Sequence, residues 1–243
     1  MHIISYRRLR EYTEKYTDCR QALDNWYQLS TQAKWSNLVE VEFIFPKAEA
    51  VGNFTVSNIK GNQYRLIVSV DYQKQLIYIK YILTHAEYDK RCDPASAKDA
   101  RERAPRRING KMTLTTDPES YAQLLVKYQP KVIETEAEND RAIALSQQLE
   151  HKTNRTPQED AILELLVTLI EKFEDKQYFI PSGTPHSMLL HLMEARDLKQ
   201  ENLIGVIGSR GVVSEVVNGK RSISKTQAKA LAKFFSVDVG LFI

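Results

Sequence analysis

The sequence predicts an α+β protein, in which a small antiparallel sheet with helices on one face is followed by an all-α region that ends in five short helices. Two observations predict this order. Between Gly52 and Thr84, apolar residues alternate with period two, as they do in half-buried strands. On both sides of that stretch they recur at the three- and four-residue spacing of amphipathic helices.

Residues 5–33 contain neither Gly nor Pro and predict two helices. Asp18 is the expected N-cap of the second helix, because its carboxylate can accept the first unpaired backbone N–H groups. The apolar stripes consist of Tyr6, Leu9, Tyr12 and Tyr16 in the first helix and of Leu23, Trp26 and Tyr27 in the second.

Three strands are predicted next, FTVSNI, YRLIVSVDY and LIYIKYILTH, with turns at 60–62 and 73–75. Alternation places every second side chain on the same face of the sheet. We expect the two helices to cover the apolar face, so that the first domain comprises residues 1–90. That face is expected to contain Leu66, Val68 and Val70 on the second strand and Ile77, Ile79, Tyr81 and Leu83 on the third.

Residues 112–185 are predicted to be helical. Thr116 and Thr156 are the expected N-caps before Pro118 and Pro157, and Thr156 with Glu159 has the spacing of a capping box. A Pro- and Gly-containing break at 180–185 separates this region from residues 186–243. The apolar stripe of the longest helix is Ile162, Leu165, Leu166, Leu169, Ile170 and Phe173.

Composition argues against several classes of protein. No window approaches the ~18 consecutive apolar residues of a membrane span, and the first residues carry charges where a signal peptide has its apolar run. We therefore expect a cytoplasmic protein with no membrane partner. Cys19 and Cys92 lack the spacing of a disulfide framework or a zinc site. Nucleotide-binding and metallohydrolase motifs are absent, so we expect neither a metal nor a cofactor.

The net charge of +3 is unevenly divided along the chain. Residues 1–90 carry +2, 91–111 carry +4, 112–185 carry −6 and 186–243 carry +3. An acidic segment between basic ends suggests parts that bind each other or bind different partners. The alternative is a solvated acidic helix face.

Residues 186–243 divide into five short helical segments, HSMLLHLMEARDL, KQENLIGVIG, SRGVVSEVVNGKR, SKTQAKALAKFF and VDVGLFI. Gly208 ends the second segment, and 218–221 closes the third. This layout resembles the XRE/Cro-type helix-turn-helix family, which implies that the third helix enters the DNA major groove. Ser209, Arg210 and Ser214 are then expected at base edges, and Lys220 and Arg221 on phosphates. Alternatively, NGKRS is only a helix end with solvated charges.

The first domain also resembles a known family. The phrases MHIISYRRLREYTEKY, FTVSNIKGNQYRLIV and YIKYILTHAEYDK are similar to HigB-type toxins of the RelE superfamily of mRNA interferases. The resemblance covers nearly all of residues 1–90. It implies a ribosome-dependent endoribonuclease that cuts mRNA without a metal.

Such an enzyme activates a ribose 2′-hydroxyl to attack the adjacent phosphate, which needs a base, an acid and cations. We expect His85 and Tyr88 to serve the proton transfers. Arg65 is expected to stabilise the phosphate together with Lys60 and Lys80, because a fixed guanidinium suits that task. The residues expected to position the RNA are Asn58, Asn62 and Lys90.

Each of these residues has a plainer alternative. His85 at a strand end is then a half-buried structural histidine, and Lys80 a solvated strand residue. Arg65 is harder to dismiss, because a charge among Leu66, Ile67 and Val68 needs a reason. Asp89 would repel RNA, so a structural or tuning role is expected for it.

Residues 112–243 resemble HigA-type antitoxins, and a HigB-like toxin followed by such a segment has the gene order of Hig toxin–antitoxin systems. The whole chain is thus expected to be a fused toxin–antitoxin protein. Residues 91–111, with Pro-, Ala- and Arg-rich composition, predict a flexible linker that resembles translated intergenic sequence or an added tether, and Met112 stands where a separate antitoxin would begin.

The acidic region 112–185 is the expected toxin-binding part, within one chain or between two. Its carboxylates would compete with RNA for the basic face, or its bulk would exclude the toxin from the ribosome. Operator DNA, bound by a homodimer that represses its own operon, is the second expected partner. The alternative is a transcription regulator whose first domain is catalytically inactive and serves dimerisation or corepression. The residues expected at the contact are Glu134, Glu136, Glu138 and Asp140, with Leu165, Leu169 and Phe173.

Overall fold

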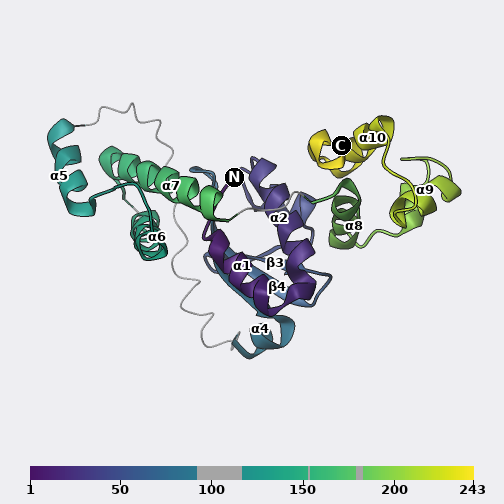
Figure 1. The fold of residues 1–243 in the computed structure, drawn as a ribbon, viewed down its shortest axis with the longest axis horizontal. Coiled ribbons are helices and arrows are strands. Elements are labelled where there is room, and N and C mark those ends of the chain that lie inside the picture. The colour runs from purple at the N-terminus through teal and green to yellow at the C-terminus, as the bar shows by residue number, and fades with distance from the viewer. Residues whose placement is uncertain (92–116, 153, 179–182) are drawn as a thin grey trace.

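The computed structural model of the protein describes residues 1–91, 117–152, 154–178 and 183–243. The N-terminal part forms a five-stranded sheet in the order β1-β5-β4-β3-β2 (Figure 1). The three predicted strands are present as β3 (Phe54–Ile59), β4 (Tyr64–Asp71) and β5 (Leu76–Thr84), paired antiparallel. Two short edge strands were not predicted: β1 (His2–Ile4), parallel to β5, and β2 (Glu49–Val51), antiparallel to β3.

Four helices belong to this part: α1 (Tyr6–Lys15), α2 (Arg20–Gln32), α3 (Leu38–Ile44) and α4 (His85–Arg91). The apolar sides of α1 and α2 join the core on one face of the sheet, as predicted. The prediction that Asp18 caps α2 was wrong. Cys19 occupies the N-cap position, and Asp18 lies in the preceding 3-10 turn, where its carboxylate binds Lys60 Nζ at 2.5 Å and Tyr64 Oη at 2.8 Å.

A β-bulge changes which side chains of β5 face the helices. Ile67 pairs with Tyr81 whereas Val68 pairs with Ile79, so Lys80 is the extra residue. Before the bulge, Ile77 and Ile79 lie in the helix-covered core as predicted; after it, Ile82 takes that side. The prediction for Tyr81 and Leu83 was therefore wrong, because one inserted residue moves every later side chain to the opposite face.

The next region is helical, with α5 (Pro118–Tyr128), α6 (Glu136–Glu150) and α7 (Pro157–Gln177). The capping box of Thr156 and Glu159 is confirmed, and Thr135 with Glu138 forms another at the start of α6. Asp117 caps α5, whereas the predicted cap Thr116 lies outside the described residues, as does the linker 91–111 apart from the backbone of Arg91. Apolar residues of α6 and α7 pack on Ile4, Leu76 and Tyr78. The second face of the sheet is thus covered at its β1–β5 side, which the sequence did not predict.

The C-terminal region contains α8 (Pro185–Ala195), a 3-10 turn (Gln200–Leu203), α9 (Arg210–Val217), α10 (Lys225–Phe235) and a second 3-10 turn (Val239–Phe242). The order of the five predicted segments is confirmed, although the second and fifth are 3-10 turns. Gly208 does not end the second segment, since that turn stops at Leu203 and Gly208 lies five residues further in a loop with a φ of 142°.

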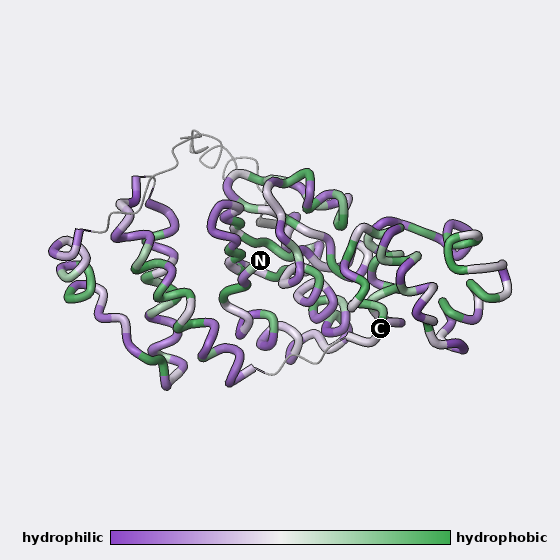
Figure 2. Tube along the Cα trace, turned by 90° about the horizontal axis from the view of Figure 1, so that it is seen from above, coloured by the Kyte–Doolittle hydropathy of each residue, from purple (hydrophilic) through white to green (hydrophobic). Residues whose placement is uncertain are grey.

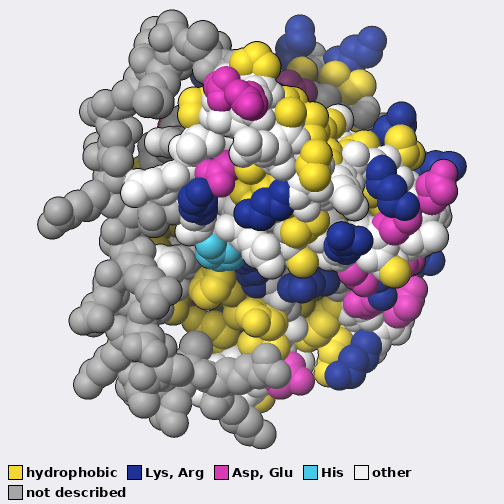
Figure 3. All heavy atoms as spheres, turned by 90° about the vertical axis from the view of Figure 1, so that its left-hand side faces the viewer, with side chains coloured by type: hydrophobic (Ala, Val, Ile, Leu, Met, Phe, Trp, Pro, Cys, Tyr) yellow, Lys and Arg dark blue, Asp and Glu magenta, His cyan; other side chains and the backbone are white. Residues whose placement is uncertain are grey.

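The N-terminal domain lies between α5–α7 on one side and α8–α10 on the other (Figure 1). Met188, Leu189 and Leu192 of α8 share one core with Trp26 and Trp35. Hydrophobic residues follow the central strands in Figure 2. Figure 3, seen from the α5 side of Figure 1, shows acidic and basic side chains interspersed with hydrophobic ones. Within the described residues, no helix combines the length and the hydropathy of a membrane span.

Candidate functional site

Two rows of side chains cross the face of the sheet that α1 and α2 leave free. In one row Asn58 pairs with Arg65, which pairs with Leu83. In the neighbouring row Val56 pairs with Ile67, which pairs with Tyr81. Val56, Ile67 and Leu83 form a small apolar cluster against which Tyr88 of α4 packs. The predicted residues Asn58, Arg65 and Tyr88 are therefore brought together.

Arg65 is only 8% exposed and lies at the centre of this arrangement. Its Nη1 donates to Asn62 O at 3.3 Å and to Tyr64 O at 3.5 Å, and its Cζ is 5.7 Å from the centroid of the Tyr88 ring. Among the described residues, no carboxylate lies within ion-pair distance of this guanidinium. A buried cation without an anionic partner is costly unless it serves a ligand, so Arg65 is suited to bind a phosphate.

Helix α4 follows β5 directly; it places Tyr88 over Arg65 and begins with His85. Its start is fixed by a reciprocal pair, in which Thr84 N donates to Glu87 Oε2 at 2.8 Å and Glu87 N donates to Thr84 Oγ1 at 3.2 Å. His85 N donates to Gln63 O at 2.9 Å, which ties the helix to the β3–β4 hairpin. The His85 side chain is exposed, with Nδ1 3.6 Å from Asp89 Oδ1. An accessible imidazole oriented by a carboxylate suits proton transfer.

The hairpin between β3 and β4 adds polar groups at the same end of the sheet. Asn58 Nδ2 donates to Asn62 Oδ1 at 3.1 Å. Lys60 does not join the cluster, because its ammonium is ion-paired with Asp18 at the helix-covered side. The hydrogen bonds of Asp18 with Lys60 and Tyr64 hold the pKa of that carboxyl below its usual range, and burial raises the pKa of Tyr64 to about 12. Lys60 is thus neutralised within the fold rather than presented to a substrate.

Lys80 also lies away from the cluster. As the extra residue of the bulge it comes three positions before Leu83, and its Nζ lies 5.2 Å from the centroid of the Tyr78 ring, toward α6. Burial lowers the pKa of its ammonium. Of the remaining predicted residue, Lys90, only the backbone within α4 is described. Tyr81 was missed by the sequence reasoning, because a one-residue bulge leaves no mark on the alternating pattern.

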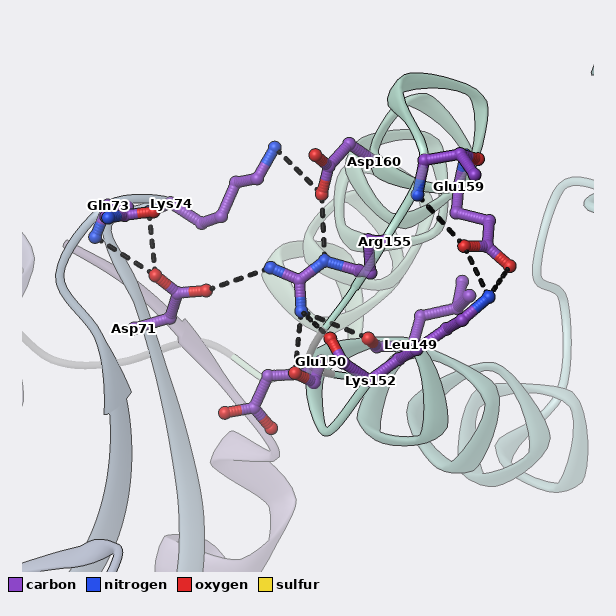
Figure 4. Close-up of polar contacts among 10 residues, drawn as sticks. Asp71, Gln73, Lys74, Leu149, Glu150, Lys152, Arg155, Glu159 and Asp160 are labelled. Carbon is purple, nitrogen blue, oxygen red and sulfur yellow. Dashed lines mark hydrogen bonds and ion pairs between the residues drawn. The ribbon is translucent and has the colours of Figure 1, made fainter. Parts of the chain in front are cut away.

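The helices α6 and α7 attach beside this site rather than over it. Arg155, in the loop between them, donates to Leu149 O at 3.1 Å and Glu150 O at 2.6 Å, and it lies 3.6 Å from Asp71 of the sheet (Figure 4). Asp160 accepts from Arg155 Nε at 2.8 Å and lies 3.3 Å from Lys74 Nζ (Figure 4). This network joins the β4–β5 turn to the start of α7.

The predicted acidic contact forms with α1 and not with Arg65. Glu136 and Asp140 lie 3.5 and 3.1 Å from Arg7 Nη1. Glu138 instead binds Lys131 and the backbone at its own helix start, which lowers the pKa of its carboxyl to about 2. Phe173 lies in the apolar contact and Leu169 at its margin, whereas Leu165 belongs to neither. Glu136 and Asp140 thus bind a basic helix, away from the candidate site.

The predicted DNA-contacting residues gather around α9. Ser209 is its N-cap residue without a side-chain cap bond, and Arg210 is its first residue. Ser214 Oγ accepts from Asn218 Nδ2 at 3.1 Å, one turn further along. Arg221 lies 3.2 Å from Glu215. The exposed members of this set are Ser209, Arg210, Lys220 and Arg221, and Ser214 is half-buried.

Known proteins are similar to the N-terminal part of the chain. Residues 19–91 match the HigB_toxin family, described as the RelE-like toxic component of a toxin–antitoxin system. The mRNA interferase HigB of Escherichia coli O6:H1 is 30% identical over 93 residues, which are 37% of this chain and 90% of that protein. The mRNA interferase toxin HigB of Escherichia coli K12 and the mRNA interferase HigB of Shigella flexneri are each 26% identical over 92 residues, 37% of this chain and 88% of those proteins.

Proposed function

Because the chain belongs to the HigB family of RelE-like toxins through its N-terminal domain, we propose that this domain is a ribosome-dependent mRNA endonuclease, which the rest of the chain neutralises. The observation that carries the proposal is Arg65, a nearly buried guanidinium without a carboxylate partner among the described residues. Tyr88 lies over Arg65, and His85 is the first residue of the same helix.

In this mechanism the 2′-hydroxyl loses its proton and attacks the adjacent 3′-phosphate, the bond from phosphorus to the 5′-oxygen of the next nucleotide breaks, and that oxygen takes up a proton. His85 is exposed at the rim, where it can take up or deliver a proton, and Asp89 orients its ring. Tyr88 lies over Arg65, where its hydroxyl can serve the second proton transfer. Arg65 stabilises the charge that develops on the phosphate, aided by its fixed position on β4. Asn58 and Asn62 hold the RNA at the same end of the sheet.

We propose that two groups of helices, α5–α7 and α8–α10, neutralise the N-terminal domain by packing on it. One group packs its apolar residues on Ile4, Leu76 and Tyr78, and the other shares the core of α1 and α2. A covalent link raises their local concentration to about the millimolar range, so contact within one chain or exchange between two chains outcompetes a separate antitoxin.

Expression of residues 1–91 alone tests the nuclease proposal. We expect this fragment to arrest growth and translation and to produce cuts within translated messages, mapped by primer extension. The full chain at the same level should leave growth normal, because its helices stay bound. Normal growth with a fragment shown to be soluble and folded would instead favour a regulator whose first domain lacks catalysis.

We also propose that residues 186–243 read operator DNA as an XRE/Cro-type helix-turn-helix, in a homodimer that represses its own transcription. The exposed Arg210 at the start of α9 supports this, since the first turn of a recognition helix faces base edges. Arg210→Ala should weaken binding to DNA from upstream of the gene by about tenfold or more in a gel shift. Lys233→Ala, an exposed cation in the last turn of α10, is the matched control. Equal losses in the two variants would remove Arg210 from the base contacts.

A further inference from the structure

We propose that Tyr81 and Lys80 extend the RNA-binding surface beyond the cleavage site: an RNA base stacks on the Tyr81 ring, and the backbone beside it contacts the Lys80 ammonium. The inference rests on the proposed function, because it identifies single-stranded RNA as the occupant of this face. It adds a residue that stacks on a base to a site whose other residues are proposed to act mainly on the phosphate and the proton transfers.

The bulge at Lys80 places Tyr81 beside Arg65. Tyr81 pairs with Ile67, and Arg65 lies two residues before Ile67 on the same face. Such diagonal neighbours are about 7–8 Å apart, with their Cβ atoms somewhat closer, which is within reach of aromatic and long side chains. If Lys80 paired with Ile67 in a regular ladder, Tyr81 would pair with Leu66 and face the core under α1 and α2.

Tyr81 is exposed where its neighbours on β5 are not. Its side chain is 53% exposed, whereas Tyr78, Ile79, Ile82 and Leu83 are all buried. The cover supplied by α6 and α7 on this face includes Leu76 and Tyr78 but not Tyr81, which lies outside each of the apolar clusters of the described residues. A large, accessible ring on a rigid strand next to a phosphate-binding cation has the form of a nucleobase platform.

The edge of β5 fixes this geometry. Strand β1 pairs only with Leu76–Tyr78, so within the described ranges no strand pairs with this edge of β5 from Ile79 on. Arg8 of α1 satisfies that edge, with Nη1 donating to Ile79 O at 3.1 Å and to Lys80 O at 2.6 Å. The bulge is thereby held in place, and Arg8 is a positioning residue for Tyr81. Two cations lie in neighbouring positions of the sheet: Lys80 precedes Tyr81 on β5 with its ammonium over the Tyr78 ring, and Arg65 lies two residues before Ile67, the partner of Tyr81 on β4.

Single-stranded RNA suits this surface better than a protein partner, because an exposed aromatic ring with cations at neighbouring positions of the sheet suits a base and its nearby phosphates. No carboxylate lies within ion-pair distance of either Lys80 or Arg65 in the described part of the chain. Sequence-tolerant stacking would position the message in the site without selecting a particular codon.

The experiment uses the full chain and a short single-stranded RNA that carries 2-aminopurine, whose fluorescence falls when the base stacks. Wild-type protein should bind the RNA and quench the probe, and Tyr81→Phe should behave alike. Tyr81→Leu keeps an apolar side chain but should lose the quench and weaken binding by about tenfold. Lys80→Gln should keep the quench and flatten the dependence of log affinity on log salt by about 0.7. Phe43→Leu, an exposed aromatic residue on α3, is the matched control and should change neither readout.

Two results would overturn the inference. One is an unchanged quench and affinity in Tyr81→Leu, which would leave the nuclease proposal intact. The other is failure of the wild-type chain to bind the RNA, in which case this surface is not an RNA site in the fused protein. The nuclease proposal is then judged separately by the growth and message-cleavage assay of residues 1–91.

Discussion

Replacing Arg65 by Ala is expected to lower message cleavage by residues 1–91 by about 10²- to 10³-fold, the usual loss when one preorganised charge donor is removed. The guanidinium is held by two carbonyls and the Tyr88 ring and has no carboxylate partner among the described residues. Its charge is thus available to the phosphate at no cost of reorganisation. Arg65→Lys should recover only part of the rate, because an ammonium lacks the planar set of donors.

The measurement is single-turnover cleavage of a ribosome-bound message by purified fragment. Lys34→Ala, at an exposed position just after α2, is the control for removal of one positive charge. Circular dichroism must show that Arg65→Ala is folded, since its loss leaves the Asn62 and Tyr64 carbonyls without this donor. A folded Arg65→Ala variant that cleaves at the wild-type rate would remove Arg65 from the mechanism.

The strands of the sheet were predicted from the sequence only in part. Alternation identifies β3, β4 and β5, because each buries one face over at least six residues. It misses β1 and β2, whose three residues are too short for a period to show. It also misassigns Tyr81, since the bulge depends on how two strands pair and on Arg8 binding the β5 edge. Strand pairing depends on contacts between segments that are distant in the sequence, so the pattern within one segment does not reveal it.

The residues of the candidate site were also predicted only in part. The sequence predicts a functional role for Arg65, because a charge among apolar strand residues needs a partner, and the guanidinium lies on the face of the sheet that α1 and α2 leave free. Lys60 looked equivalent in the sequence, yet a left-handed turn with a φ of 52° places it where Asp18 neutralises it. Which cation remains unpaired depends on residues more than forty positions away. Local sequence cannot report such a contact.

The helical half was predicted in its elements but not in its contacts. Capping signals predicted the start of α7, because a cap is formed by residues three apart. The face of α7 that binds the sheet was predicted only in part, through Phe173 and Leu169, and Glu174, a carboxylate on the inner side of α7, was not predicted. Glu174 is only 5% exposed, and its oxygens accept from Tyr6 N and from Asn139 Nδ2 at 3.4 Å each. It ties the end of α7 to the start of α1.

Ionisation of Glu174 should make the packing of α7 on the N-terminal domain depend on pH. Burial raises the pKa of its carboxyl from 4.5 to about 7, an effect that the hydrogen bonds from Asn139 and from the backbone of Tyr6 and Ser5 partly offset. Between pH 4.5 and about 7, the Glu174 carboxyl is therefore protonated in the folded chain and ionised in the unfolded chain. Stability must fall as the pH rises through that window, by up to about 3 kcal/mol. His2, Glu136, Glu171 and Asp175 are the other titratable groups near this contact, and Glu136 raises the same pKa further.

Glu174→Gln should remove this dependence and stabilise the chain at pH 8 by about 2 kcal/mol, with little effect at pH 5. The amide imitates the protonated acid, and its N–H can donate to Asn139 Oδ1, a buried atom without a partner in the described part of the chain. Urea denaturation at both pH values measures the effect, with Glu164→Gln on the solvent side of α7 as control. Equal stabilities of wild type and Glu174→Gln at pH 8 would show that the buried carboxylate bears no ionisation penalty. A gain confined to high pH would instead mean that ionised Glu174 loosens α7 from the N-terminal domain, so alkaline conditions should favour release of the toxin.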